Sequence, residues 1–210
     1  MYTRRATLGA LATTGVAALA GCSLLNDPLQ REAEPAAVAE SAANSTGFTQ
    51  DELVEQVAET SVEINNESRD LSLTNWLNRY TRAAPDIELD AALFGLLTTP
   101  TVTVAGRSAN PLRRLDRERL LQEMLDRLGV VPIENIQQVG ERQVTVLGEA
   151  APVEEFLAET EQEVSLRLHL GDRTHESDLL VLFALHPELL DLTGDVDTLA
   201  EGVVHPTERS

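Results

Sequence analysis

Four short apolar patterns follow one another in the second half of the chain with few residues between them, at 142–147, 153–159, 164–170 and 179–185. Residues 164–170 alternate strictly, which is typical of a strand with one buried and one solvated face. Residues 179–185 are apolar throughout and indicate a central strand covered on both sides. Such closely connected strands predict an antiparallel sheet, and the loop 171–177 predicts that the last two form a hairpin.

One amphipathic helix is predicted over residues 116–128, because its leucines and Met124 fall on a single stripe and Gly129 supplies the stop. Shorter helices are predicted at 35–45, ended by Gly47, and at about 195–202. The expected fold class is therefore α+β, with an antiparallel sheet packed against one main amphipathic helix plus short terminal helices. A further hairpin is expected from 54–64 and 71–80, with its turn at 65–68, and a short strand at 101–105.

The charge of the chain restricts its partners. The formal charge is −19, all 16 basic residues are arginine, and removing Arg4 and Arg5 with a leader would take it to −21. This charge excludes nucleic acid, which is bound through cationic neutralisation of phosphates. Acidic residues spread along the chain repel one another, and molar salt relieves that repulsion by shortening the screening length to roughly 3 Å. The composition thus indicates adaptation to high salt.

The first 21 residues have the features of an export signal. Arg4 and Arg5 precede a mild apolar stretch, 6–20, that is too short to span a membrane. Twin arginines before such a stretch indicate the translocase that exports folded proteins, although Thr7 stands where Phe is usual. The stretch ends in Leu19, Ala20, Gly21 and Cys22, which match the lipobox of lipoprotein precursors.

Cys22 is the only cysteine, so no internal disulfide can form and its thiol is the expected lipid attachment point. The predicted organisation is a signal peptide at 1–21, a lipidated tether at 22–34, one domain at 35–206 and a tail at 207–210. The expected location is the extracytoplasmic face of the cell membrane. The expected partners are the membrane and, during maturation, the export translocase.

No catalytic motif is found. A nucleophile elbow, a phosphate-binding glycine loop and an EF-hand are all missing from the sequence. None of His169, His175, His186 and His205 has metal-ligand spacing to another histidine or carboxylate, so they are interpreted as surface or capping residues, with His169 on the solvated face of its strand. No catalytic residue, metal or cofactor is predicted.

Two weaker features remain. Asn75, Trp76, Arg79 and Tyr80 place amides, a cation and aromatic rings in one short segment, which could line a ligand groove or simply pack onto the sheet. Asn44 and Asn66 begin glycosylation sequons, which chance alone would also supply.

Several segments resemble a haloarchaeal family of lipoproteins, exported by the twin-arginine route, whose domain has no assigned function. They are the leader, 32–38, 74–76, 97–112, 139–148 and the closing His205–Pro206. The resemblance implies a membrane-anchored, extracytoplasmic protein of a halophilic archaeon, carrying an archaeal ether lipid, and it brings no catalytic residues.

The sequence therefore predicts a cell-surface lipoprotein that acts as a non-enzymatic binding or structural module of the envelope. Two alternatives stay open. One is an anchored hydrolase or metal-dependent enzyme, and the other is a small protein that captures a solute.

Overall fold

The computed structural model describes residues 29–208 except 65–66, 85–86, 105 and 131. Its elements, in chain order, are β1 (Leu29–Glu32), β2 (Ala37–Val38), α1 (Glu40–Thr46), β3 (Thr49–Ile64), β4 (Glu67–Ala84), β5 (Ile87–Pro100), β6 (Thr103–Val104), β7 (Arg107–Ser108), η1 (Leu112–Arg114), α2 (Arg117–Leu128), β8 (Ile133–Val146), β9 (Glu149–Thr160), β10 (Ser165–His175), β11 (Asp178–Pro187), α3 (Thr193–Glu201) and β12 (Val203–Val204).

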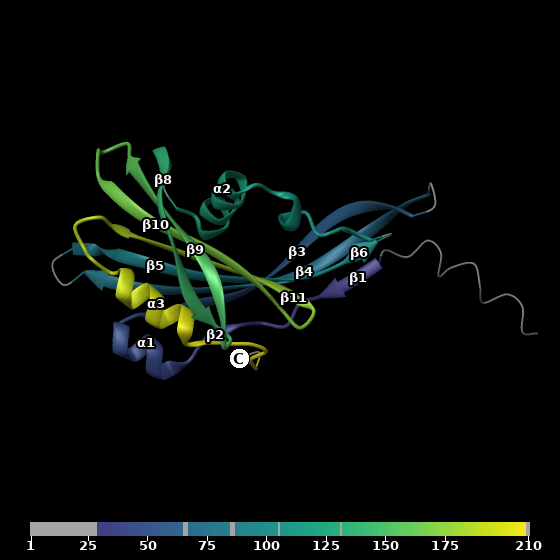
Figure 1. Cartoon of the computed structure of the whole chain (residues 1–210), viewed down its shortest axis with the longest axis horizontal. Helices are drawn as coiled ribbons and strands as arrows, with labels where there is room; N and C mark the ends of the chain where they lie inside the picture. The colour runs from purple at the N-terminus through teal and green to yellow at the C-terminus, as the bar shows by residue number, and fades with distance from the viewer. Residues whose placement is uncertain (1–28, 65–66, 85–86, 105, 131, 209–210) are drawn as a thin grey trace, which may run out of the picture.

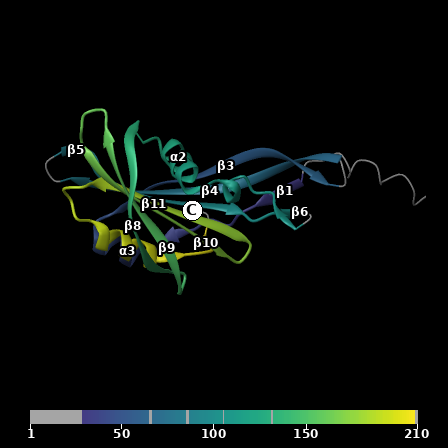
Figure 2. The same cartoon turned by 45° about the horizontal axis from the view of Figure 1, so that its top comes forward.

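A mixed eight-stranded sheet forms the body of the molecule. Its strands follow the order β3–β4–β5–β11–β10–β9–β8 through antiparallel pairs, and β1 lies parallel to β4. β1 pairs with Leu71–Thr74, whereas β5 pairs from Trp76 onward, so these two strands occupy successive stretches of one side of β4. The sheet is strongly twisted, and β8, β9 and β10 cross β3, β4 and β5 at a steep angle (Figures 1 and 2).

Helices cover both faces of this sheet. Alternation along β11 sends Val181 and Phe183 into the core beneath α2, and Leu180 and Leu182 into the core shared with α1 and α3. Figure 1 accordingly shows α2 on one side of the sheet and α1 and α3 on the other. Because both of its faces are buried, β11 is apolar throughout, as predicted for a central strand.

The predicted fold class is wrong. The described part of the chain is mostly β, with a large mixed sheet and three short α-helices, and it is not an antiparallel sheet packed on one main helix. The prediction failed because it contained no β5 and treated the terminal helices as minor additions. In the structure α3 packs Val196, Leu199 and Ala200 into a core as closed as that beneath α2.

The amphipathic helix predicted over residues 116–128 is confirmed as α2. The Asp116 carboxylate accepts the N–H of Arg119 at 2.9 Å and caps the first turn. Gly129, in the left-handed region at φ 64°, ends the helix and donates to the carbonyls of Asp126 and Leu125. The stripe facing the sheet consists of Leu120, Leu121, Met124, Leu125 and Leu128, all buried. No helix within the described residues is long and apolar enough to cross a membrane.

Both predicted hairpins are confirmed. β3 pairs with β4 from Ile64↔Glu67 back to Thr49↔Thr81, and β10 pairs with β11 from His175↔Asp178 to Leu166↔Pro187. The helix expected at 35–45 is α1, which Gly47 closes at φ 72°, but it begins only at Glu40 because residues 37–38 pair with β12 as the strand β2. Residues 29–32, which lie in the segment predicted as a tether, form β1.

Candidate functional site

β4 carries the four residues predicted to line a groove, and strand alternation divides them between its two faces. Asn75 lies on the α2 side and lines a cavity there. Tyr80 is 1% exposed on the other side, where its hydroxyl accepts the N–H of Val38 at 2.8 Å. Trp76 is also buried, whereas Arg79 lies near the surface in an ion pair with Asp51. The four side chains therefore do not form one groove.

A cavity of about 180 Å³ lies between η1, α2 and the sheet. One polar residue of its wall, Asn75, is buried and lacks a hydrogen-bond partner for part of its side chain. The side chain is 2% exposed, and its Nδ2 donates to the carbonyls of Gln56 and Leu73, but its Oδ1 has no partner among the described residues. The wall consists of Ala58, Leu73, Asn75, Thr99, Asn110, Pro111, Leu112, Leu115, Glu123 and Arg127.

The other polar groups of this cavity are satisfied. Asn110 donates to Thr99 Oγ1 and to the Pro100 carbonyl, both at 2.8 Å, and its Oδ1 accepts the N–H of Leu112. Arg127 is paired with Glu123 at 2.8 Å and donates to Gln56 Oε1. Asn75 is therefore the one polar residue of the wall with an unpaired side-chain atom among the described residues, although that oxygen is itself buried, and the charges of Arg127 and Glu123 cancel.

Two histidines form a buried pair on the opposite face of the sheet. His169 and His186 are each 1% exposed, their rings stack, and their Nε2 atoms lie 3.1 Å apart. Arg142 Nη1 donates to His169 Nδ1 at 3.0 Å, and His186 Nδ1 donates to the Pro187 carbonyl. The guanidinium can only donate and the carbonyl can only accept, so the neutral chain runs Arg142 to His169 to His186 to Pro187.

The pKa of His169 is lowered to about 3, mainly by burial and then by the positive charges that Arg142, Arg167 and a protonated His186 would set against a second charge. Burial also lowers the pKa of His186. Arg142 is held in turn by Asp197 on α3 and by Glu155, which also binds Arg167. The predicted solvated position of His169 is wrong, because α3 covers this face of β10 and supplies Val196, Asp197 and Ala200 around the ring.

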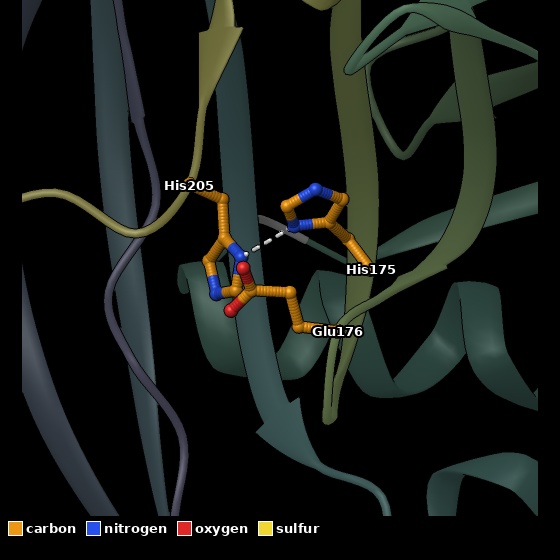
Figure 3. A group of neighbouring side chains, drawn as sticks. All are labelled: His175, Glu176 and His205. Atoms are coloured by element: carbon orange, nitrogen blue, oxygen red, sulfur yellow. Dashed lines mark hydrogen bonds between the residues drawn. The ribbon is translucent and has the colours of Figure 1, made fainter.

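The other two histidines meet at one end of the sheet. His175 ends β10 and His205 follows β12, and their Nδ1 atoms face each other at 3.0 Å. Glu176, in the turn after β10, brings its carboxylate beside the two rings (Figure 3). One ligand atom from each of His175, Glu176 and His205 lies within 4.8 Å of the others.

Asp178 supports this group from behind. His205 Nε2 lies 3.2 Å from Asp178 Oδ2 and 3.2 Å from the carbonyl of Glu34. The same Oδ2 accepts the N–H of Glu34 at 2.8 Å. The His205 and Asp178 side chains are 1% and 2% exposed. The expectation that the histidines do not pair is thus corrected for all four of them.

The spacing of the four histidines along the sequence did not indicate that they form these two pairs. His169 and His186 are diagonal neighbours across β10 and β11, since His169 stands opposite Ala184, so only the register of the predicted hairpin could have indicated them. His175 and His205 are separated by α3 and meet through the tertiary fold.

The export and anchoring residues Arg4, Arg5, Leu19, Ala20, Gly21 and Cys22 lie outside the described residues, as does Asn66. Asn44 is exposed on α1.

The chain belongs to a family described as a domain of unknown function, DUF6517, whose model matches residues 35–204. This match agrees with the prediction of a domain without an assigned function. No curated protein matches the chain.

Two solved structures are similar to parts of the chain. One is a protein of unknown function, PA94 from Pseudomonas aeruginosa, with 10% identity over 65% of this chain and 87% of that one, and a TM-score of 0.29. The other is LpqN, involved in cell envelope biogenesis of Mycobacterium tuberculosis, with 12% identity over 75% of this chain and 89% of that one, and a TM-score of 0.37. At these values the likeness carries no argument about function.

Proposed function

We propose that the chain is a lipid-anchored, extracytoplasmic and non-enzymatic binding module, adapted to high salt, that holds a small uncharged ligand in the cavity beneath α2. The observation that carries the binding role is Asn75. A buried amide oxygen without a partner costs free energy, typically about 1–3 kcal/mol. Asn75 Oδ1 is covered in the structure, so a ligand removes that cost by turning the Asn75 amide toward the cavity and donating to its oxygen. The anchor is proposed from the twin arginines and the lipobox that ends at Cys22.

The cavity also indicates the chemistry of the ligand. Most of its wall is apolar, and Arg127 and Glu123 neutralise each other, so a charged ligand would be desolvated without compensation. The wall suits a small molecule with an apolar body and one N–H or O–H group that meets Asn75 Oδ1. Mostly apolar pockets with few placed polar groups are typical of small-molecule sites.

The test compares 1-hexanol and hexanamide with hexyl methyl ether, which lacks a donor, by titration of the isotope-labelled full chain in molar salt. We expect the two donors to bind about fivefold to tenfold more tightly than the ether, as one hydrogen bond of about 1 kcal/mol implies. The amide signals that move should belong to α2, η1 and β4.

The matched control uses the opposite face of the same strand. Asn75→Leu should abolish the preference for a donor, because the free acceptor is lost. Asn78→Leu should preserve the preference, because Asn78 is equally buried and its Oδ1 is also unpaired among the described residues, but it lies on the Tyr80 side. Equal affinity for the ether and the alcohol in the unaltered chain would refute the proposed role of Asn75.

A further inference from the structure

Three distant segments of the chain converge on His205. Asp178 begins β11 and accepts from both His205 and the backbone of Glu34, which precedes β2. Thr207 donates to the carbonyl of Pro35 at 2.9 Å, so the chain beyond β12 runs beside the segment before β2. His175 and Glu176 arrive from the β10–β11 turn. Of the three side chains in Figure 3, His175 and Glu176 thus come from the β10–β11 hairpin, and His205 comes from the segment after β12.

The protonation of His205 follows from its partners. Its Nε2 faces two acceptors, the Asp178 carboxylate and the Glu34 carbonyl, so Nε2 carries the proton. In the neutral ring Nδ1 is then a lone pair, and it points at Nδ1 of His175. Two ring nitrogens at 3.0 Å need either a proton or a metal ion between them, because two facing lone pairs repel.

From this geometry we infer a site for a divalent transition-metal ion, of the zinc class, bound by His175 Nδ1, His205 Nδ1 and a carboxylate oxygen of Glu176. Zinc–nitrogen bonds of about 2.0–2.1 Å at a tetrahedral angle set the two nitrogens about 3.3 Å apart. The rings therefore need to separate by only a few tenths of an ångström. Glu176 is exposed in its turn, so its carboxylate can swing onto the ion without disturbing the core.

The donor set selects the class of metal. Two imidazoles with one carboxylate suit zinc, copper, nickel and cobalt, whereas calcium and magnesium take oxygen ligands. Asp178 supplies the support typical of such sites, because a carboxylate that accepts the far N–H of a ligating histidine fixes its tautomer and raises its basicity. His175 is half-buried, and its Nε2 has no hydrogen bond among the described residues, so it can move its proton to Nε2 and free Nδ1 for the metal.

Bound metal would join the β10–β11 turn to the segment after β12. Three protein ligands leave a fourth position for water or for a donor from a partner. The site requires neither the lipid anchor nor the cavity beneath α2, so the test of the metal site is independent of the test of the proposed function.

The test titrates the metal-free full chain with Zn²⁺ by calorimetry and with Co²⁺ by visible absorption, in molar salt. All proteins carry Cys22→Ser, which removes a competing thiol. We expect one ion per chain, tetrahedral cobalt bands, and ring-nitrogen NMR shifts for His175 and His205. Zinc should also raise the melting temperature of the chain.

Variants locate the site. His175→Ala should weaken binding at least 100-fold, and Asp178→Asn, acting through His205, about 10-fold to 100-fold. Glu176→Gln should weaken binding about tenfold, whereas Glu163→Gln should leave it unchanged. Glu163 is the matched control, because it is an exposed glutamate at φ 59° in another turn, as Glu176 is at φ 53°.

Substitution of the exposed Glu176 keeps the test open even where a histidine variant folds poorly. Absence of stoichiometric binding in the parent chain would overturn the inference. Binding that survives His175→Ala, or that Glu163→Gln and Glu176→Gln weaken equally, would overturn it as well, because the ion would then lie elsewhere.

Discussion

At the scale of single residues, the buried pair of His169 and His186 makes the fold sensitive to acid. The folded protein keeps His169 neutral down to about pH 3, because burial and the neighbouring Arg142 oppose a second charge. In the unfolded chain the same ring takes up a proton near its ordinary pKa of 6.5. The unfolded state therefore binds more protons between these two values, and the folded state loses relative stability as the pH falls through that window.

We predict that the free energy of unfolding is steady above about pH 6.5 and falls below it, by up to about 1.4 kcal/mol per pH unit for His169 alone. The lowered pKa of His186 acts in the same direction. Urea unfolding between pH 7.5 and 5.5, at constant high salt, measures this slope while most free carboxylates remain ionised.

His169→Leu should show a shallower slope than the unaltered chain, because one of the two shifted groups is removed. An NMR titration in which the His169 ring takes up its proton near pH 6.5 in the folded protein would contradict the assignment.

At the scale of elements, local patterns predicted those parts that local physics determines. The α2 stripe, with its Asp116 cap and Gly129 stop, and the two hairpins with their turns could all be found from the sequence. β5 was missed, although its run Leu93–Phe94–Gly95–Leu96–Leu97 is as apolar as the run that predicted β11, because Gly95 interrupts the pattern of a strand. The two histidine pairs could not be predicted for a different reason, because they depend on which strands and segments become neighbours in the fold.

Gly95, in the middle of β5, shows why this strand contains a glycine. A Cβ there would lie 2.9 Å from Leu128 Cδ1 and 3.0 Å from Cδ2, so α2 packs directly onto the strand backbone. We predict that Gly95→Val lowers the free energy of unfolding by about 1–3 kcal/mol through overpacking. Chemical denaturation measures the loss.

Two further variants test this contact: one removes the Leu128 methyl groups, and the other substitutes a glycine that has no close neighbour, as a control. Leu128→Ala should make the valine cost much smaller, because the clashing methyl groups are gone, so the two changes couple in a double-mutant cycle. Gly194→Ala should stabilise the protein by up to about 1 kcal/mol, because it lies in α3 and a Cβ there meets nothing within 4 Å. Additive effects of Gly95→Val and Leu128→Ala would exclude the proposed contact.

At the scale of the whole molecule, the fold begins close to the proposed anchor. β1 starts at Leu29, seven residues after Cys22, so a lipid on that sulfur would hold this end of the sheet near the membrane surface. We predict that Cys22→Ser releases the protein into the medium or leaves the precursor uncleaved. Fractionation of cells with detection of the mature form measures the outcome.

The control for this prediction is Arg4→Lys with Arg5→Lys, which should block export and leave the protein inside the cell. A processed form that stays on the membrane after Cys22→Ser would contradict the lipid anchor.

Within the described residues β3 and β8 each pair on one side only, as does the short strand β1. β3 is long, and its exposed carboxylates are Asp51, Glu52, Glu55, Glu59 and Glu63. In dilute buffer, two β3 edges that approach each other meet like charges, which opposes edge-to-edge aggregation. In molar salt the screening length of about 3 Å is shorter than the roughly 4.8 Å between paired strands.

The charges then protect the edge only weakly, and protection depends on shape. β8 breaks its register between Glu134 and Gln137 and again between Gln138 and Gly140, and β3 breaks its own between Gln50 and Glu52. Such irregularities bend a strand away from a would-be neighbour. If the proposed anchor crowds copies together on one membrane, these irregularities would help to keep the sheets of adjacent molecules from joining into fibres.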